Sequence, residues 1–206
     1  DEGVIPQNPM GRIKLARERR VRRSILATSE EDLLLKHAPD HLRHIITCAL
    51  DTGMRRGEIT AQLWEDVDFH RKVLYVTHSK TPEGEAREIP LTKRLLAVLS
   101  GMRKDKGLIF TYQDSKVVIL KTAWHSTIRR AGIRYLRFHD LRHSFNSRLM
   151  EAGVMQEVRM ALMGHSGGNS VHMRYTHVEL PRKRDAIARL EAWVHQQRNQ
   201  PEEGGT

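Results

Sequence analysis

The spacing of apolar residues along most of this chain has a helical period, which predicts a mainly helical protein. Residues 40–52 carry one such stripe, and Gly53 directly after it is a natural residue to end the helix. The same spacing, with capping residues, predicts further helices at residues 28–38, 92–100, 118–131, 139–152, 155–163 and 181–195. In the first of these, Thr28 and Glu31 have the spacing of a capping box.

Two short runs have a different pattern. Residues 73–77 and 86–91 are apolar and rich in residues that favour strands, and Pro82 and Gly84 lie between them. They predict an antiparallel hairpin. The predicted fold class is therefore mainly α with a small antiparallel β-sheet, an α+β arrangement.

The 206 residues suffice for one well-buried domain with short appendages. We expect a basic linker or arm over residues 1–27, a globular domain over 28–195, and a disordered polar tail over 196–206. The chain begins at Asp1 rather than at methionine, so we expect it to be a fragment or a processed form of a longer protein.

The formal net charge is +10, which favours a polyanionic partner, with nucleic acid first and an acidic membrane second. Solubility alone is the alternative explanation. Aromatic residues make up only 5% of the chain, so stacking of bases on aromatic side chains is not expected to dominate binding. The basic residues of the first segment predict an arm along a phosphate backbone or, alternatively, a solvated connector: Arg12, Lys14, Arg17, Arg19, Arg20, Arg22 and Arg23.

Cys48 is the one cysteine of the sequence, so no internal disulfide can form, which fits a reducing cytoplasm. No apolar run is long enough to span a membrane, and no secretory signal is visible. Three histidines recur at helical spacing, at His37, His41 and His44. No cysteine or carboxylate completes a known metal-site spacing with them, so no metal is expected.

Candidate chemistry is concentrated in one later stretch. His139 and Arg142 are three residues apart, so a helix would place them on one face. Gly164 precedes His165, and Tyr175 follows ten residues later. Arginine offers a fork of donors that matches phosphate, histidine can move a proton near neutral pH, and tyrosine can act as a covalent nucleophile. These residue types support phosphate chemistry.

This pattern resembles the tyrosine recombinases of the phage integrase family, whose signature is an early Arg, a hairpin Lys, His-x-x-Arg, Gly-His and a late Tyr. The resemblance covers residues 28–195 and implies that this part is the family's catalytic domain. The signature occurs here in the family's order: Arg55 with its acidic partner Glu58, Lys80, His139, Arg142, His165 and Tyr175. Taken singly, the first pair could be a surface ion pair, and Lys80 an ordinary turn lysine.

The resemblance implies a site-specific DNA recombinase that cleaves and rejoins DNA through a covalent 3′-phosphotyrosyl intermediate, with no cofactor. The two arginines and the second histidine would hold the phosphate. The first histidine would accept the proton of Tyr175, and Lys80 would protonate the leaving 5′-oxygen. Two other functions remain open: a type IB topoisomerase-like enzyme that nicks and closes DNA, and a DNA-binding module without catalysis.

The partners that the resemblance implies are double-stranded DNA and further copies of the chain, as a homo-tetramer on paired sites. The predicted C-terminal helix, which Pro181 can start, would dock on a neighbouring copy or, alternatively, pack on its own domain. The implied location is the cytoplasm, in association with the nucleoid, for a protein of bacterial or phage origin.

Overall fold

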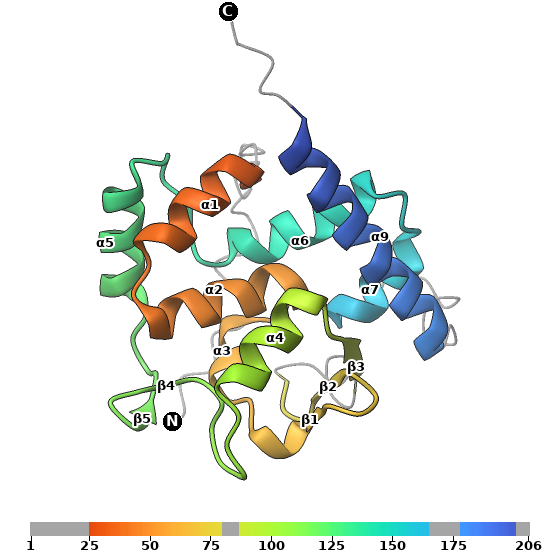
Figure 1. Cartoon of the computed structure of the whole chain (residues 1–206), viewed down its shortest axis with the longest axis horizontal. Helices are drawn as coiled ribbons and strands as arrows, with labels where there is room; N and C mark the ends of the chain where they lie inside the picture. The colour runs from red at the N-terminus through yellow and green to blue at the C-terminus, as the bar shows by residue number, and fades with distance from the viewer. Residues whose placement is uncertain (1–24, 80–86, 165–177, 201–206) are drawn as a thin grey trace, which may run out of the picture.

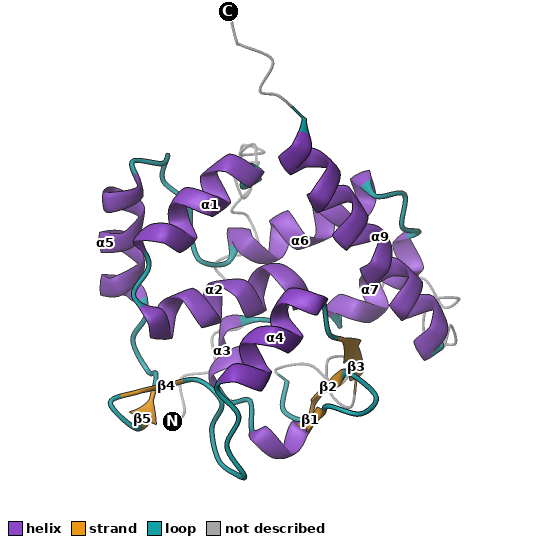
Figure 2. Cartoon of the chain, in the orientation of Figure 1, coloured by secondary structure: helices purple, strands orange, loops and turns teal. Residues whose placement is uncertain are grey.

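The structure is a computed structural model that describes residues 25–79, 87–164 and 178–200. Helices dominate this part of the chain (Figure 2). The elements in chain order are α1 (Thr28–His37), α2 (Asp40–Thr52), α3 (Arg56–Thr60), the 3₁₀ turn η2 (Trp64–Asp66), β1 (Val67–Asp68), β2 (Val73–Val76), β3 (Arg87–Pro90), α4 (Lys93–Gly101), β4 (Thr111–Tyr112), β5 (Ser115–Lys116), α5 (Lys121–Ala131), α6 (Asp140–Glu151), α7 (Gln156–Met163) and α9 (Leu180–Asn199). The predicted fold class is confirmed.

Helices α2 and α6 form the centre of the molecule (Figure 1). Each has an apolar stripe, so that Leu42 and Ile46 of α2 and Leu141 and Phe145 of α6 are completely buried. In Figure 1, α1 and α5 lie on one side of this pair, and α7 and α9 lie on the other. Gly53 permits a close approach of the two helices, because it ends α2 with φ 62° and a Cβ there would lie 2.3 Å from Phe145 Cδ1.

Strands β1, β2 and β3 form one antiparallel sheet in that order. Val73 pairs with Pro90 and Val76 pairs with Arg87, which confirms the two strands of the predicted hairpin. Strand β1 adds a third strand, which the sequence pattern does not predict because only two of its residues pair with β2.

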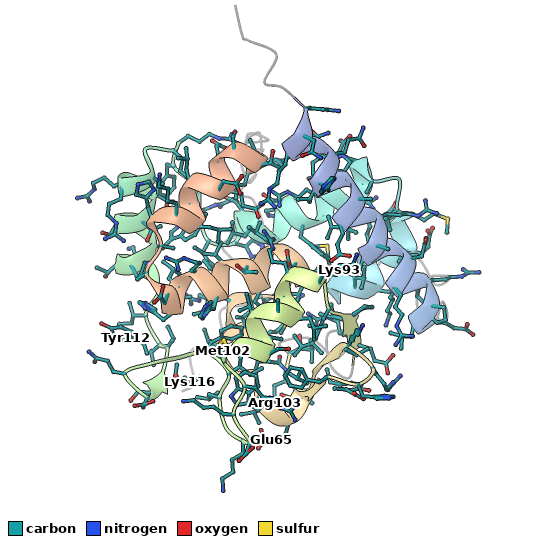
Figure 3. The ribbon with its side chains drawn as sticks, viewed as in Figure 1. Glu65, Lys93, Met102, Arg103, Tyr112 and Lys116 are labelled. Atoms are coloured by element: carbon teal, nitrogen blue, oxygen red, sulfur yellow. The ribbon has the colours of Figure 1, made fainter. Side chains whose placement is uncertain are left out.

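A second hairpin joins β4 to β5. Its turn residues, Gln113 and Asp114, have φ of 50° and 57°, as a two-residue hairpin turn requires. Figure 3 places Tyr112 and Lys116 of this hairpin at the edge of the molecule. Strands of two residues show no alternating pattern, so the sequence analysis does not identify them.

The helix ends follow local chemistry in most places. Gly132 ends α5 in the left-handed conformation, and the Thr92 hydroxyl accepts a backbone N–H in the first turn of α4, both as predicted. The capping box predicted for α1 is wrong. The helix begins at Thr28, and the backbone N–H of Ala27 donates to the Glu30 carboxylate at 2.9 Å.

Helix α9 carries the last apolar stripe of the chain. Ala186, Ile187 and Leu190 are buried, and the helix packs against α1, α6, α7 and β3 of its own chain. It continues to Asn199, past the boundary at residue 195 that we expected between domain and tail. Among the described helices, none combines the length and the apolar character needed to cross a membrane.

Candidate active site

Arg142 lies in the first turn of α6, and only 2% of its surface is exposed. Its guanidinium donates to the backbone carbonyls of Gly53, at 2.6 Å, and Met163, at 2.7 Å. These carbonyls end α2 and α7, so one side chain joins three helices. Burial, together with the nearby charge of Arg55, lowers the pKa of Arg142 to about 9, which leaves it a cation at neutral pH.

Arg55 and Glu58 meet at the start of α3. Arg55 is the residue before the helix, and Glu58 lies in its first turn. The Glu58 carboxylate accepts the backbone N–H of Arg55 at 2.8 Å and its guanidinium at 2.8 Å. The carboxylate therefore caps the helix and orients the arginine at once. The Arg55 side chain is 24% exposed, compared with 3% for Glu58, so Arg55 is the member of the pair that reaches solvent.

Two residues that the sequence analysis missed complete this cluster. Arg87 of β3 donates to the Glu58 carboxylate at 2.6 Å, and the Ser79 hydroxyl donates to it at 2.7 Å. Burial works to raise the pKa of Glu58, but Arg87, Ser79 and the Arg55 backbone outweigh it and hold the pKa at about 2. One signal could have identified Arg87: it is two residues before the buried Ile89, so it shares the inward face of its strand and needs a partner there.

Three arginines meet the C-terminal end of α7, where helix carbonyls lack partners within the helix. This end also carries partial negative charge, which favours cations. The donor–acceptor pairs are Arg87 Nε to the Leu162 carbonyl at 3.1 Å, Arg142 Nη2 to the Met163 carbonyl at 2.7 Å, and Arg55 Nη2 to the Gly164 carbonyl at 3.3 Å. Three consecutive carbonyls thus hold guanidiniums from three separate parts of the chain.

His139 directly precedes α6 and is exposed. Its ring packs edge to face against His143, with 4.9 Å between the ring centroids. Desolvation, followed by the charges of Arg142, Arg137 and Arg55, lowers the pKa of His139 below its ordinary value. The neutral imidazole, which can accept a proton, therefore dominates at pH 7.

Counted over the described residues, the cluster has an excess of positive charge. Glu58 is the carboxylate that acts on the guanidiniums of Arg55, Arg87 and Arg142. Within the described ranges, no three side chains of His, Cys, Asp or Glu come together in a way that could hold a metal ion. An anion with several oxygens, such as a phosphate, would be attracted to this cluster and could accept hydrogen bonds from Arg55.

Four of the predicted site residues fall within the described part of the chain, and they are neighbours: Arg55, Glu58, His139 and Arg142. Lys80, His165 and Tyr175 lie outside the residues that the structure describes. The same holds for the predicted arm: Arg12, Lys14, Arg17, Arg19, Arg20, Arg22 and Arg23. In the sequence, Gly164, which ends α7 with φ 61°, is followed directly by His165.

A sequence model described as the phage integrase family matches residues 19–181. The shufflon-specific DNA recombinase of Escherichia coli is 32% identical over 204 aligned residues, which cover 93% of this chain and 51% of that protein. The chain spans about half the length of the curated relatives it matches.

Solved structures share the fold. The integrase from mycobacterium phage Brujita has a TM-score of 0.69 and 24% sequence identity, and the match covers 92% of this chain and 68% of that one. The Tn1549 transposon integrase, solved in complex with circular intermediate DNA, has a TM-score of 0.62 and 20% identity, with 81% and 65% covered.

Proposed function

Because the chain belongs to the phage integrase family, we propose that it is the catalytic part of a site-specific recombinase, which cleaves and rejoins double-stranded DNA through a 3′-phosphotyrosyl intermediate. The observation that supports this most is the cluster of Arg55, Arg142 and His139 beside the end of α7. Groups of the kinds that can bind phosphate and accept a proton are neighbours in this cluster, and His165 directly follows Gly164 in the sequence.

In the proposed reaction the scissile phosphate lies against Arg55 and Arg142. They offset the negative charge that builds up on the oxygens of five-coordinate phosphorus, and His165 adds a third donor. A guanidinium has five N–H donors, so Arg142 keeps donors for phosphate while it also bonds to two carbonyls. Arg55 is the more exposed of the two arginines and makes the first contact with DNA.

Tyr175 supplies the nucleophile in this proposal. Its phenolic oxygen attacks phosphorus while the bond from phosphorus to the 5′-oxygen breaks. His139 accepts the phenolic proton, and Lys80 donates a proton to the departing 5′-oxygen. The 5′-hydroxyl of another strand then attacks the phosphotyrosine and releases the tyrosine. The number of phosphodiester bonds is unchanged, so the cycle requires no external energy source.

We further propose that four copies act together on paired DNA sites, in the cytoplasm and on the nucleoid. The inner face of α9 is buried against its own chain. A contact between copies through this helix would therefore use its outer face or the residues beyond Asn199. The basic residues of the arm, between Arg12 and Arg23, would add contacts with the DNA backbone.

The experiment that tests this function traps the covalent intermediate. Duplexes that the purified protein binds are selected from a random-sequence library and then prepared as nicked suicide substrates, from which the cleaved fragment diffuses away. The wild-type protein is expected to give a protein–DNA adduct on a denaturing gel. Tyr175→Phe, which lacks the phenolic oxygen alone, is expected to give none.

Two outcomes would contradict the proposal: equal adduct from Tyr175→Phe, or no adduct from the wild-type protein on duplexes that it binds. A third outcome separates related activities. Adduct formation and relaxation of supercoiled DNA, without exchange between two duplexes, would indicate an enzyme that nicks and closes DNA.

A further inference from the structure

Arg87 connects Arg55 and its acidic partner Glu58 to α7, although none of the motifs found in the sequence includes it. It is 5% exposed, and it donates to the Glu58 carboxylate at 2.6 Å and to the Leu162 carbonyl at 3.1 Å. We propose that Arg87 is a positioning residue, which holds Glu58 against Arg55 and fixes both to the end of α7. This inference rests on the proposed function, because Arg55 is the residue that would bind phosphate.

The hydrogen bonds of Glu58 explain how Arg87 acts through it. One carboxylate oxygen, Oε1, accepts from the Arg55 guanidinium at 2.8 Å and from the Ser79 hydroxyl at 2.7 Å. The other, Oε2, accepts from the Arg55 backbone at 2.8 Å and from Arg87 at 2.6 Å. With both oxygens held, the carboxylate has one orientation, and so has the guanidinium that it bonds.

The ionised state of Glu58 also depends on Arg87. Burial disfavours the charged carboxylate, and Arg87 makes the largest of the contributions that oppose burial and lower the pKa. The other groups that face it are Arg55 and Ser79, while the charge of Arg142 on α6 lies farther away. Without Arg87, burial should raise the pKa of Glu58, and a protonated Glu58 would hold Arg55 less firmly.

The test compares three variants. Arg87→Met removes the charge and the hydrogen bonds but keeps most of the volume. Arg87→Lys keeps the charge and loses the planar fork. Arg148→Met is the matched control, because Arg148 of α6 forms a similarly buried pair with Glu31 of α1. Folding is checked by circular dichroism, and cleavage is measured on the nicked duplex between pH 5.5 and pH 8.

We expect Arg87→Met to cleave about tenfold more slowly than wild type at pH 8, and the deficit to grow at least about threefold further by pH 5.5. A comparison with wild type at each pH removes the effect of His139, which both proteins share. Arg87→Lys should cleave at an intermediate rate with a constant deficit. Arg148→Met should lower the unfolding temperature. The folded variant should cleave DNA at the same rate as the wild-type protein at every pH.

A carboxyl-detected NMR titration of Glu58 separates this inference from the proposed function. In folded Arg87→Met, Glu58 should titrate at a higher pH than in wild type. An unchanged titration would overturn the inference whether or not the protein cleaves DNA. A cleavage deficit that stays constant with pH in Arg87→Met, or one that Arg148→Met reproduces, would overturn it as well. Absence of adduct from wild type would count against the proposed function, while the titration would still decide the role of Arg87.

Discussion

Two buried glutamates each gather arginines, but the two clusters differ in their charge balance. Glu31 of α1, which is completely buried, contacts arginines from three other helices: Arg94, Arg148 and Arg198. Two of these reach a second carboxylate, since Arg94 also pairs with Asp51 and Arg198 with Asp32. The Glu31 cluster therefore balances three guanidiniums with three carboxylates and joins α1, α2, α4, α6 and α9.

Among the residues that the structure describes, the Glu58 cluster has one carboxylate acting on the guanidiniums of Arg55, Arg87 and Arg142. Further hydrogen bonds of these arginines go to backbone carbonyls and, from Arg55, to the Ser79 hydroxyl, and none of these acceptors carries a net charge. Arginine–glutamate pairing can therefore have two different roles in one protein. With matched charges it holds helices together, and with an excess of guanidiniums it presents positive charge to an anion.

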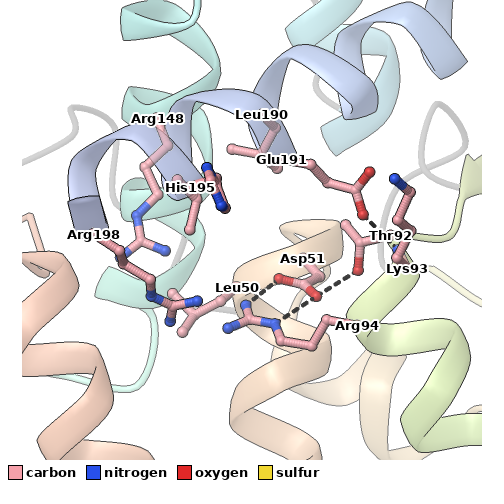
Figure 4. A pocket seen from close by; sticks show the side chains of 11 residues that line it. Leu50, Asp51, Thr92, Lys93, Arg94, Arg148, Leu190, Glu191, His195 and Arg198 are labelled. Carbon is pink, nitrogen blue, oxygen red and sulfur yellow. Dashed lines mark hydrogen bonds and ion pairs between the residues drawn. The ribbon is translucent and has the colours of Figure 1, made fainter.

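A cavity of about 230 Å³ lies beside the Glu31 cluster, between α2, α4 and α9. Figure 4 shows Arg148 and Arg198 on one side of it and Asp51 with Arg94 on the other. Within the described chain, the Arg148 Nε is buried without a hydrogen-bond partner. The carboxylates around this cavity still balance its arginines, so it lacks the excess charge of the Glu58 cluster.

The largest effect should come from replacing Arg55, the most exposed arginine of the Glu58 cluster. Arg55→Ala removes the donor that we propose for the phosphate, so we expect cleavage to slow by about 10²- to 10³-fold. The unfolding free energy should change by only about 1 kcal/mol, because Glu58 keeps its bond to Arg87. Single-turnover cleavage and urea unfolding measure the two quantities.

Arg94→Ala provides the matched control in the other cluster, since its side chain is 30% exposed, compared with 24% for Arg55. The substitution removes one paired cation from each of Glu31 and Asp51, so the unfolding free energy should fall by about 2–4 kcal/mol. The cleavage rate of the folded protein should stay within about twofold of wild type. Equal losses of cleavage in the two variants would remove the distinction between the clusters.

The second-largest expected effect is a loss of stability in acid, to which both glutamates contribute. Burial opposes ionisation, but the surrounding arginines hold the pKa of Glu31 below its ordinary value and the pKa of Glu58 at about 2. A depressed carboxyl pKa stabilises the fold above the unfolded pKa, near 4.5, and that stability is lost as the pH falls toward the folded pKa. For Glu58 the loss should be on the order of 3 kcal/mol.

In each of the variants Glu58→Gln and Glu31→Gln, the loss of stability in acid that the replaced glutamate causes should be absent. Urea unfolding between pH 5 and pH 2 measures this loss. Only the first should slow cleavage at pH 7, because only Glu58 orients Arg55. Parallel stability curves for Glu58→Gln and wild type would show that this carboxylate is not held ionised by its neighbours.

The smallest effect is expected at an ion pair outside both clusters. Arg189 and Asp185 pair along α9 at 2.8 Å, but their side chains are 52% and 62% exposed. Arg189→Ala should therefore lower the unfolding free energy by no more than about 0.5 kcal/mol and leave cleavage unchanged. A loss comparable to that of Arg94→Ala would mean that burial is not what gives the clusters their strength.

Local pattern sufficed to predict most of the helices and the first hairpin, because apolar spacing and glycine ends are properties of short segments. The resemblance to the phage integrase family is what pointed to Arg55, His139 and Arg142 as site residues. The roles of these residues stay predictions, as do those of Lys80 and Tyr175. The strands of two residues leave no such pattern in the sequence, because so short a run has no period.

Long-range contacts explain what the sequence analysis missed. Arg87 has no motif of its own, and its partner Glu58 lies 29 residues earlier in the chain. The spacing between Thr28 and Glu31 in the sequence predicts that Glu31 caps a helix. In the structure it is instead buried and pairs with Arg94, Arg148 and Arg198. Only the packing of the helices brings such residues together, and no local spacing encodes it.

The acceptors at the end of α7 are main-chain oxygens, and this has a consequence for directed evolution of the protein. Every residue type carries such an oxygen, so exchanging the side chain of Leu162 or Met163 deletes no acceptor from the arginines. Libraries that vary these two positions can alter packing while the anchoring atoms remain. Changes that redirect the main chain, such as proline inside α7, are the ones that selection should remove.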